Sequence, residues 1–354
     1  MIINENEMLE MLKKANKVFL LEPNYRRKYP PLGLAKISTF LQENDIASEF
    51  GRVYDGQECD LVCITSLFTF QSEKIFEAIE QVHFLNPGVS ILLGGVFASL
   101  MTSPIHRRYP DISIFKGYSK ELDQCVPNYN IDASLEEPWT KFSFVFTSRG
   151  CPNKCAYCAV WRIEPEQWIN PHWRDAIDED KPYVMISDNN LSACSFEHIK
   201  EVVNYCIDHN KRIVFDNGFD CKHITQEMAE LLGKAKYTRS GMRLAFDRIE
   251  EDGIFQKAVN LLIDAGVPKS QIMAYVLFNF HDTLEEADYR MRVCADLGIR
   301  PYPQKYEPLT ELNRDTPFIG KHWNKGLLKK FRYFWLMGGL YTKTTFSEYV
   351  KMEI

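Results

Sequence analysis

TSRGCPNKCAYC, which runs from Thr147 to Cys158, is the stretch on which the fold prediction rests. It places Cys151, Cys155 and Cys158 at CxxxCxxC spacing, immediately after a strand-like apolar run. Thiolates are the usual ligands of iron–sulfur clusters, and three thiolates leave one iron of a 4Fe–4S cluster without a protein ligand. Such an open coordination position is what a catalytic metal needs. The alternative is a zinc site completed by a remote residue such as His172, although zinc ribbons usually contain two CxxC pairs and no second pair occurs here.

Strand-like apolar runs recur downstream of this stretch and predict a barrel. They begin near Phe144, Tyr183, Ile213, Met242, Ile272 and Pro301. The later starts are about thirty residues apart, which is the length of one βα unit. Residues suited to cap the intervening helices are Thr225 and Thr283 at the starts and Gly266 and Gly298 just past the ends. Six units predict a partial, laterally open (β/α)6 TIM barrel over residues 142–310, followed by a helical extension at 311–354. The cysteines then lie at the C-terminal mouth of the barrel, where barrel enzymes carry out their chemistry.

The first part of the chain also alternates apolar strands with amphipathic helices. Strands are expected at 17–21, 47–50, 60–65, 90–93 and 112–115, and helices at 32–41 and 72–84. This alternation predicts a parallel, doubly wound sheet of the Rossmann or flavodoxin type over residues 1–128. A stretch at 128–141 with proline, aspartate and little periodicity separates it from the barrel. The whole chain is therefore expected to be an α/β protein.

Composition favours a soluble protein that acts on a small molecule. The 354 residues carry 42 Lys and Arg against 48 Asp and Glu, for a formal net charge of −6. A protein that grips nucleic acid would usually show a basic surplus, so we expect a small polar substrate and no nucleic acid. The N-terminus lacks the features of a signal peptide, and no apolar run approaches the ~18 residues that span a bilayer, which predicts a cytoplasmic protein without a membrane partner. Clustered thiols in that reducing compartment favour metal over disulfides.

The cysteine loop, with Tyr157 directly before its last cysteine and the (β/α)6 pattern after it, resembles the radical S-adenosylmethionine (SAM) superfamily over residues 142–309. The resemblance implies that SAM chelates the open iron. It also implies that an electron from a donor such as flavodoxin or ferredoxin splits SAM to methionine and a 5′-deoxyadenosyl radical, which abstracts hydrogen from the substrate. The positions that the superfamily uses around SAM correspond to Tyr157, Ser187, Asp188, Asn189, Arg243 and Asp247. The usual Gly-Gly-Glu pattern at the second strand is missing here.

Polar side chains at the predicted strand ends are candidates for substrate contacts, because barrel enzymes bind their substrates there. The third strand ends in FDNGFD at 215–220, and the sixth carries QKYE at 304–307. Carboxylates such as Glu307 could accept the N–H donors of a polar substrate. The candidate catalytic residues are Asp216, Asp220, Cys221 and His281.

The N-terminal region resembles the cobalamin-binding domain that precedes many radical SAM barrels. The resemblance covers residues 17–122 and is carried by YPPLGL at 29–34, DLVCIT at 60–65 and the glycine pair at 94–95. No Asp-x-His-x-x-Gly loop accompanies it, and Phe68 and Phe70 would crowd the sheet edge where a corrin should lie. We therefore expect a degenerate domain without cobalamin, which could instead cap the active site.

Among radical SAM enzymes, an acidic chain with a degenerate cobalamin-type domain is similar to the queuine lyases, which cleave queuine to 7-aminomethyl-7-deazaguanine. This resemblance implies a lyase-type reaction on a small polar molecule. A cobalamin-dependent radical SAM methyltransferase is the alternative function. A cluster- or zinc-containing binding protein that uses the barrel as a platform is the non-enzyme alternative. A methylthiotransferase is disfavoured, because the N-terminal region lacks three suitable cysteines.

Overall fold

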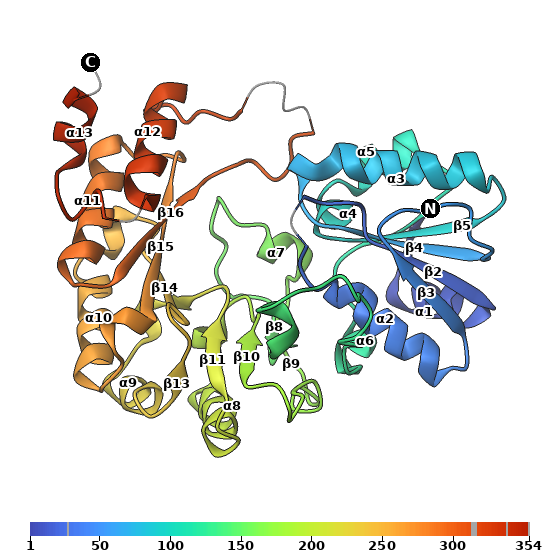
Figure 1. The fold of residues 1–354 in the computed structure, drawn as a ribbon, viewed down its shortest axis with the longest axis horizontal. Coiled ribbons are helices and arrows are strands. Elements are labelled where there is room, and N and C mark those ends of the chain that lie inside the picture. The colour runs from blue at the N-terminus through green and yellow to red at the C-terminus, as the bar shows by residue number, and fades with distance from the viewer. Residues whose placement is uncertain (27, 313–316, 338, 353–354) are drawn as a thin grey trace.

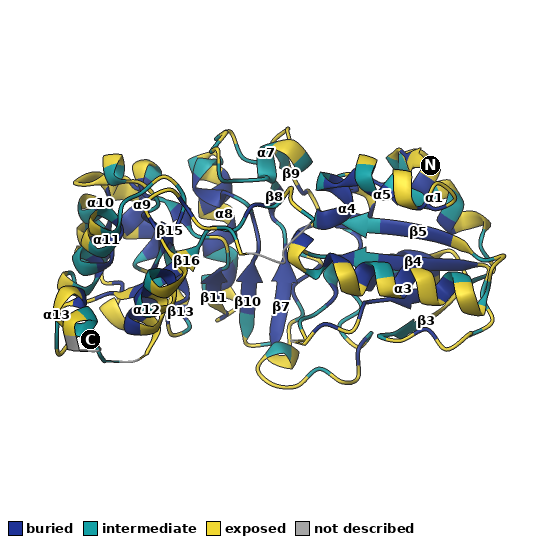
Figure 2. Ribbon diagram, turned by 90° about the horizontal axis from the view of Figure 1, so that it is seen from above, coloured by how far each residue is buried: buried dark blue, intermediate teal, exposed yellow. Residues whose placement is uncertain are grey.

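A computed structural model describes residues 1–26, 28–312, 317–337 and 339–352 of the chain. It is a mixed α/β structure whose main sheets consist of parallel strands. Figure 1 shows a layered N-terminal half, in blue and cyan, beside a C-terminal half in which the strands are flanked by outer helices. Figure 2 shows that most strands of both halves, such as β4, β7 and β10, are buried and that many exposed residues lie on helices and loops.

The N-terminal half is built on a six-stranded parallel sheet with the order β1-β6-β5-β4-β2-β3. Its strands are β1 (Ile2–Ile3), β2 (Lys17–Leu21), β3 (Ala47–Gly51), β4 (Leu61–Ser66), β5 (Ser90–Gly95) and β6 (Ser113–Phe115). Its helices are α1 (Glu5–Lys14), α2 (Leu32–Glu43), α3 (Ser72–Leu85), α4 (Val96–Leu100), α5 (Thr102–Arg108) and α6 (Lys120–Gln124).

Helices cover both faces of this sheet. Phe19 of β2 packs in one apolar cluster with Ile75 of α3. The next residue, Leu20, packs in a second cluster with Leu34 of α2. Because successive side chains of a strand point to opposite faces, a strand buried on both sides must be apolar throughout, as KVFLL at 17–21 almost is. The sheet is therefore a central layer between two layers of helices (Figure 1).

The C-terminal half contains two four-stranded parallel sheets, with the orders β13-β11-β10-β7 and β12-β14-β15-β16. A backbone hydrogen bond from Phe215 N to Gly241 O (2.9 Å), directly before β14, links them into one arc. The strands are β7 (Phe142–Val145), β10 (Tyr183–Ile186), β11 (Arg212–Phe215), β12 (Phe219–Asp220), β13 (Lys236–Tyr237), β14 (Met242–Ala245), β15 (Ile272–Phe278) and β16 (Arg300–Lys305). The helices are α7 (Val160–Ile163), α8 (Phe196–Asp208), α9 (Gln226–Leu232), α10 (Ile254–Asp264), α11 (Leu284–Asp296), α12 (Lys325–Leu336) and α13 (Phe346–Met352). A separate antiparallel ribbon pairs β8 (Ser148–Arg149) with β9 (Trp168–Ile169).

The two faces of the arc are covered differently. On the outer face, Val184 and Ile213 belong to the large core formed with the surrounding helices. On the inner face, Phe144 and Met185 pack with residues that include Tyr29 of the N-terminal half. The Tyr29 ring lies 5.5 Å from the Phe144 ring, and its hydroxyl donates a hydrogen bond to the Met185 sulfur at 3.2 Å. The N-terminal half therefore fills the inner face of β7 and β10.

The α/β prediction and most predicted elements are confirmed. The strands expected near 144, 183, 213, 242, 272 and 301 begin at 142, 183, 212, 242, 272 and 300. The side chains of Thr225 and Thr283 cap α9 and α11 as expected, and Gly266 and Gly298 have positive φ just past helix ends. The stretch 125–138 contains no helix or strand. Short elements such as β1 and α4 to α6, and the longer helix α1, were not predicted.

Among the residues that the structure describes, no helix combines the length and the apolar character that crossing a membrane requires.

Candidate functional site

The cysteine loop starts at the C-terminal end of β7 and is shaped by a glycine. Gly150 has a φ of +79°, and a Cβ atom there would lie 2.1 Å from the carbonyl oxygen of Glu166. Only glycine fits this position. The three cysteines that follow, Cys151, Cys155 and Cys158, are half-buried free thiols. Their spacing therefore places all three on one partly exposed loop, as the sequence predicts.

Two of the three sulfur atoms accept hydrogen bonds from nearby N–H groups. Cys151 Sγ accepts one from the backbone of Asn153 and one from Asn190 Nδ2, both at 3.4 Å. Cys158 Sγ accepts one from the backbone of Val160 at 3.5 Å. Hydrogen bonds to cysteine sulfur orient thiolate ligands and set the potential of iron–sulfur clusters. Three thiols with N–H donors near them are the ligand type that iron–sulfur clusters use, although among the described residues no three metal-binding side chains are grouped around one point.

Asp220 supports the middle of the same loop. Its Oδ2 accepts a hydrogen bond from Asn153 Nδ2 at 2.9 Å and lies 2.7 Å from Lys222 Nζ. Lys222 also donates to Asn153 Oδ1 at 2.8 Å. Burial by itself would raise the pKa of Asp220, but the hydrogen bonds from Lys222 and Asn153 outweigh it and lower that pKa. Asp220, expected as a catalytic residue, thus holds the cysteine loop.

A buried chain of ion pairs joins the loop to the N-terminal half. Arg149 donates from Nε and Nη2 to the two oxygens of Asp123, at 2.7 and 2.9 Å, and from Nη1 to Glu164 Oε1 at 3.1 Å. Asp123 also binds Lys36 Nζ at 2.6 Å, and Glu164 Oε2 accepts a hydrogen bond from Gly150 N at 2.9 Å. Asp123 lies on α6 and Lys36 lies on α2, so helices of the N-terminal half anchor one side of Arg149. This network fixes the residue that precedes Cys151.

Asp188, expected near SAM, is instead enclosed by the end of β7. Its carboxylate accepts hydrogen bonds from Thr147 N (2.6 Å), Thr147 Oγ1 (2.5 Å) and Ser148 Oγ (2.6 Å). The residue is 3% exposed, and burial raises its pKa to about 6. The neighbouring Asn189 donates from Nδ2 to Glu164 Oε2 at 2.5 Å. Both side chains therefore brace the base of the cysteine loop.

Tyr157 and Asp247, also expected near SAM, lie together. Tyr157 Oη donates to Asp247 Oδ2 at 3.1 Å, and Leu277 N donates to Asp247 Oδ1 at 3.1 Å. Burial raises the pKa of Asp247 to about 6. The Tyr157 ring meets the Phe280 ring edge-on at 5.8 Å, and the ring of the exposed His281 lies 3.9 Å from the Phe280 ring. The cysteine loop thus meets the C-terminal ends of β14 and β15.

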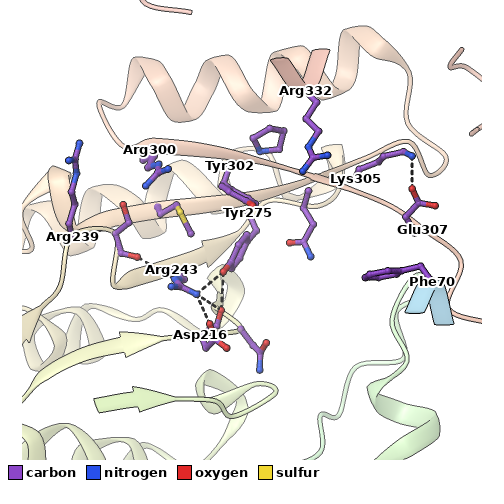
Figure 3. Close-up of a pocket in the computed structure, with 15 residues that line it drawn as sticks. Phe70, Asp216, Arg239, Arg243, Tyr275, Arg300, Tyr302, Lys305, Glu307 and Arg332 are labelled. Atoms are coloured by element: carbon purple, nitrogen blue, oxygen red, sulfur yellow. Dashed lines mark hydrogen bonds and ion pairs between the residues drawn. The ribbon is translucent and has the colours of Figure 1, made fainter. Parts of the chain in front are cut away.

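A cavity of about 1000 Å³ lies on the inner face of β14, β15 and β16 (Figure 3). Residues that line it include Phe70, Asp216, Asn217, Arg243 and Tyr275. Arg243 Nη1 donates to Asp216 Oδ1 at 2.6 Å and to Tyr275 Oη at 2.8 Å. Asn217 Nδ2 donates to the Ser187 carbonyl oxygen at 2.9 Å, which ties the cavity wall to the end of β10. The volume is at the upper end of the ~300–1,000 Å³ usual for ligand sites.

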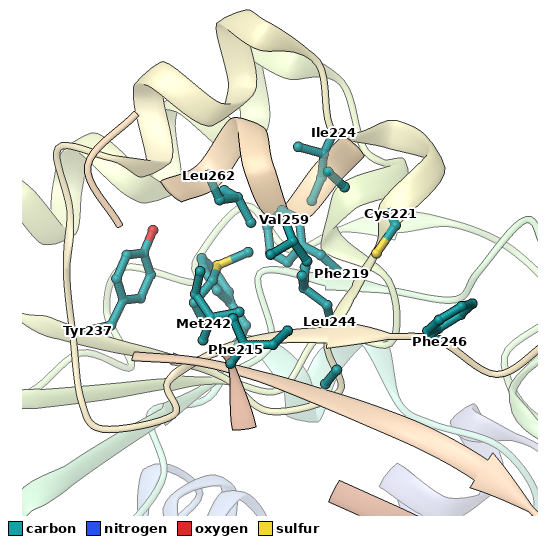
Figure 4. Close-up of a cluster of buried hydrophobic side chains, with 14 of the residues drawn as sticks. Phe215, Phe219, Cys221, Ile224, Tyr237, Met242, Leu244, Phe246, Val259 and Leu262 are labelled. Carbon is teal, nitrogen blue, oxygen red and sulfur yellow. The ribbon is translucent and has the colours of Figure 1, made fainter. Parts of the chain in front are cut away.

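Cys221 lies away from this cavity, in the apolar core on the outer side of the arc (Figure 4). Cys221 is 5% exposed, and its Sγ lies 3.5 Å from the Ala245 carbonyl oxygen. Burial raises the pKa of this thiol well above its usual value. A protonated thiol in apolar surroundings is inert, so Cys221 does not fit the catalytic role expected of it. Of the four candidate catalytic residues, Asp216 is the one that lines the cavity.

A smaller cavity, about 220 Å³, lies at the C-terminal ends of β4 and β5. The glycine pair noted in the sequence, Gly94 and Gly95, borders this cavity. Phe68 and Phe70 stack on each other at 5.0 Å, and Phe70 lines the large cavity instead. Neither ring is among the residues that line the smaller cavity, and Phe70 contributes to the large cavity of the C-terminal half.

Several residues of the site were missed from sequence. No local sequence pattern predicts that Arg149 pairs with Asp123 and Glu164. Two basic residues of the large cavity, Arg239 and Arg300, were missed as well. For Arg300 a signal exists, because Arg300, Tyr302 and Gln304 alternate along β16 and all three line the cavity, as the period of a strand requires.

No protein-family model and no curated protein matches this sequence.

Proposed function

We propose that this chain is a radical SAM enzyme that abstracts hydrogen from a small polar molecule. The observation that carries the proposal is the cysteine loop, which presents Cys151, Cys155 and Cys158 at the C-terminal end of β7 with N–H donors directed at two of the sulfurs. The three thiolates would hold a 4Fe–4S cluster and leave one iron to SAM. When bound, the cluster supplies the electron that splits SAM to methionine and a 5′-deoxyadenosyl radical.

The residues around the loop would bind SAM and the substrate, hold the loop in place and shield the reaction from water. Tyr157, held by Asp247, would pack against the adenine of SAM. Asp188 keeps the end of β7 fixed through its three hydrogen bonds, so that the loop has one geometry. Asp216, oriented by Arg243, would bind a polar group of the substrate. The N-terminal half covers the inner face of β7 and β10 and would help to exclude water from the reaction.

The proposal extends to the architecture. The six-stranded sheet fits a doubly wound domain of the Rossmann or flavodoxin type, and the arc from β7 to β16 fits a partial (β/α)6 TIM barrel. β16 is an edge strand that contains Pro301 and Pro303, which lack the backbone N–H that another strand would need. The arc would therefore stay open at β16, where a substrate can enter.

The alternative function, a cobalamin-dependent methyltransferase, is not carried into the proposal. The N-terminal cavity of about 220 Å³ is smaller than pockets for drug-sized ligands, which are themselves smaller than a corrin, and this argues against it. The reaction that we propose is a lyase-type cleavage or a rearrangement of a small polar molecule. Asp216 Oδ1 is paired with Arg243, and the second oxygen of this carboxylate could accept an N–H donor of the substrate.

Cysteine variants test the proposal under anoxic conditions. Wild-type protein reconstituted with iron and sulfide should hold about four iron atoms per chain and, with dithionite, convert SAM to 5′-deoxyadenosine. Cys151→Ala should lose both the iron and the product. Cys221→Ala is the matched control, because it removes a thiol from the apolar core, and it should retain both. Zinc in place of iron, or equal product from Cys151→Ala and wild-type protein, would refute the proposal.

A further inference from the structure

The large cavity is basic although the chain as a whole is acidic. Five basic and two acidic side chains line it: Arg239, Arg243, Arg300, Lys305 and Arg332, with Asp216 and Glu307. Asp216 Oδ1 lies 2.6 Å from Arg243 Nη1, and Glu307 Oε1 lies 2.5 Å from Lys305 Nζ. Each carboxylate therefore neutralises one basic group, and three guanidinium groups are left over. A concave surface lined by charge of one sign attracts ligands of the opposite sign.

The three remaining arginines come from different parts of the C-terminal half. Arg239 precedes β14, Arg300 begins β16, and Arg332 lies on α12, from which it extends towards the cavity (Figure 3). Within the described part of the chain, no hydrogen bond or ion pair engages any of the three side chains. The planar fork of a guanidinium matches the paired oxygens of carboxylates and phosphates. Like charges around one cavity repel one another, and an anion that binds between them offsets this repulsion.

Strand register places this charge at one end of the cavity. Arg243 and Arg300 belong to the same cross-strand layer, one residue pair from the N-terminal end of β15. The next inward-facing layer holds Tyr275 and Tyr302, whose rings meet edge-on at 5.7 Å. The cysteine loop meets the opposite, C-terminal ends of these strands through Tyr157. The open guanidinium of Arg300 is therefore at the end remote from the loop.

We propose that the substrate carries an anionic oxygen group, a carboxylate or a phosphate, which Arg239 and Arg300 bind at the end of the cavity remote from the cysteine loop. The two tyrosine rings contact the middle of the molecule, and its reacting C–H group extends towards the loop. This substrate class rests on the radical SAM function proposed above. Nucleic acid fits less well, because these basic groups line a cavity and the chain has a formal net charge of −6.

Anion binding by the full-length, cluster-loaded protein tests this inference. Isothermal titration calorimetry would measure the Kd of inorganic pyrophosphate, as the phosphate probe, and of citrate, as the carboxylate probe. At least one of them should bind, and its Kd should rise with added NaCl because exposed ion pairs are screened by salt. Arg239→Gln and Arg300→Gln should each raise this Kd about 10-fold or more, as expected for the loss of a charge-assisted hydrogen bond. Arg212→Gln should leave it unchanged, because Arg212 is an exposed arginine at the start of β11 outside the cavity lining.

Formation of 5′-deoxyadenosine from SAM, followed in the same preparations, separates this inference from the proposed function. If neither probe binds, or if Arg300→Gln and Arg212→Gln have the same effect on Kd, the anion site is refuted even where SAM is cleaved. If the probes bind through Arg239 and Arg300 but SAM is not cleaved, the anion site stands and the radical SAM function is refuted.

Discussion

Arg149 is the residue through which the cysteine loop is fastened to the N-terminal half. Arg149→Met keeps much of the side-chain volume but removes the guanidinium between Asp123 and Glu164. The side chains of these two carboxylates are 4% and 10% exposed, so water cannot replace the lost partner. The variant also loses a cation–π contact, because the Arg149 Cζ atom lies 3.4 Å from the centroid of the Phe146 ring.

The expected size of the effect follows from these partners. Removing one member of a buried ion pair costs about 3–5 kcal/mol, because it leaves an uncompensated charge. Lys36 still binds Asp123 at 2.6 Å, so we expect the lower end, about 3 kcal/mol less free energy of unfolding. Burial alone would raise the pKa of Asp123, but Arg149 and Lys36 outweigh it and hold that pKa below its ordinary value. Stabilisation from a depressed carboxyl pKa is present above the unfolded value of about 3.9 and is lost as the pH falls through the folded value.

Urea unfolding, followed by circular dichroism at about pH 7 and at about pH 3.5, measures both effects, and the difference between Arg149→Met and wild type should shrink in acid. Arg174→Met is the matched control. Arg174 pairs with Glu201 at the surface, where the side chains are 37% and 53% exposed, and such pairs contribute about 1 kcal/mol or less. Equal losses for the two variants at neutral pH would refute the reasoning about the buried network.

Two further predictions concern a buried acid and a glycine. Burial raises the pKa of Glu22 to about 7 from an ordinary value of 4.5, so the folded state loses stability as the pH rises between these values. In wild-type protein this loss should amount to about 3 kcal/mol of free energy of unfolding, measured with urea across this pH range, and Glu22→Gln should abolish it. An unchanged pH dependence of the free energy of unfolding in Glu22→Gln would contradict the prediction. Gly150→Ala should lower the iron content of reconstituted protein, because its Cβ would lie 2.1 Å from the Glu166 carbonyl oxygen. Gly88→Ala, where a Cβ meets nothing within 4 Å, is the control, and equal iron in both variants would count against this reasoning.

Much of the fold was predictable because strand spacing and helix caps are local properties of the sequence. Each of the six main strands of the C-terminal half begins within two residues of its expected start. Thr283 caps α11 because its hydroxyl and the Glu286 side chain form a capping box, which is visible in the sequence. Helices α4 and α5 were missed because 5 and 7 residues are too few to show a helical period.

The candidate site was predictable only where one segment carries it. The three cysteines share a loop because they lie within eight consecutive positions, 151–158, whatever the rest of the chain does. Arg149 and Asp123 are 26 positions apart and come from different halves, and no local pattern pairs them. Cys221 was expected to face the substrate because it follows a strand end, but the chain turns at Asp220 and sends the thiol into the outer core. Such contacts depend on tertiary packing.

Tyr29 makes the two halves of the molecule difficult to separate. The sequence boundary at 128–141 suggests two modules, yet the inner face of β7 and β10 is covered by a residue from the far side of that boundary. A fragment that began at residue 142 would expose Phe144 and Met185 to water, and large exposed apolar patches promote self-association. The C-terminal half should therefore be recovered as a monomer only when it is expressed together with the N-terminal half, which keeps this apolar face away from water.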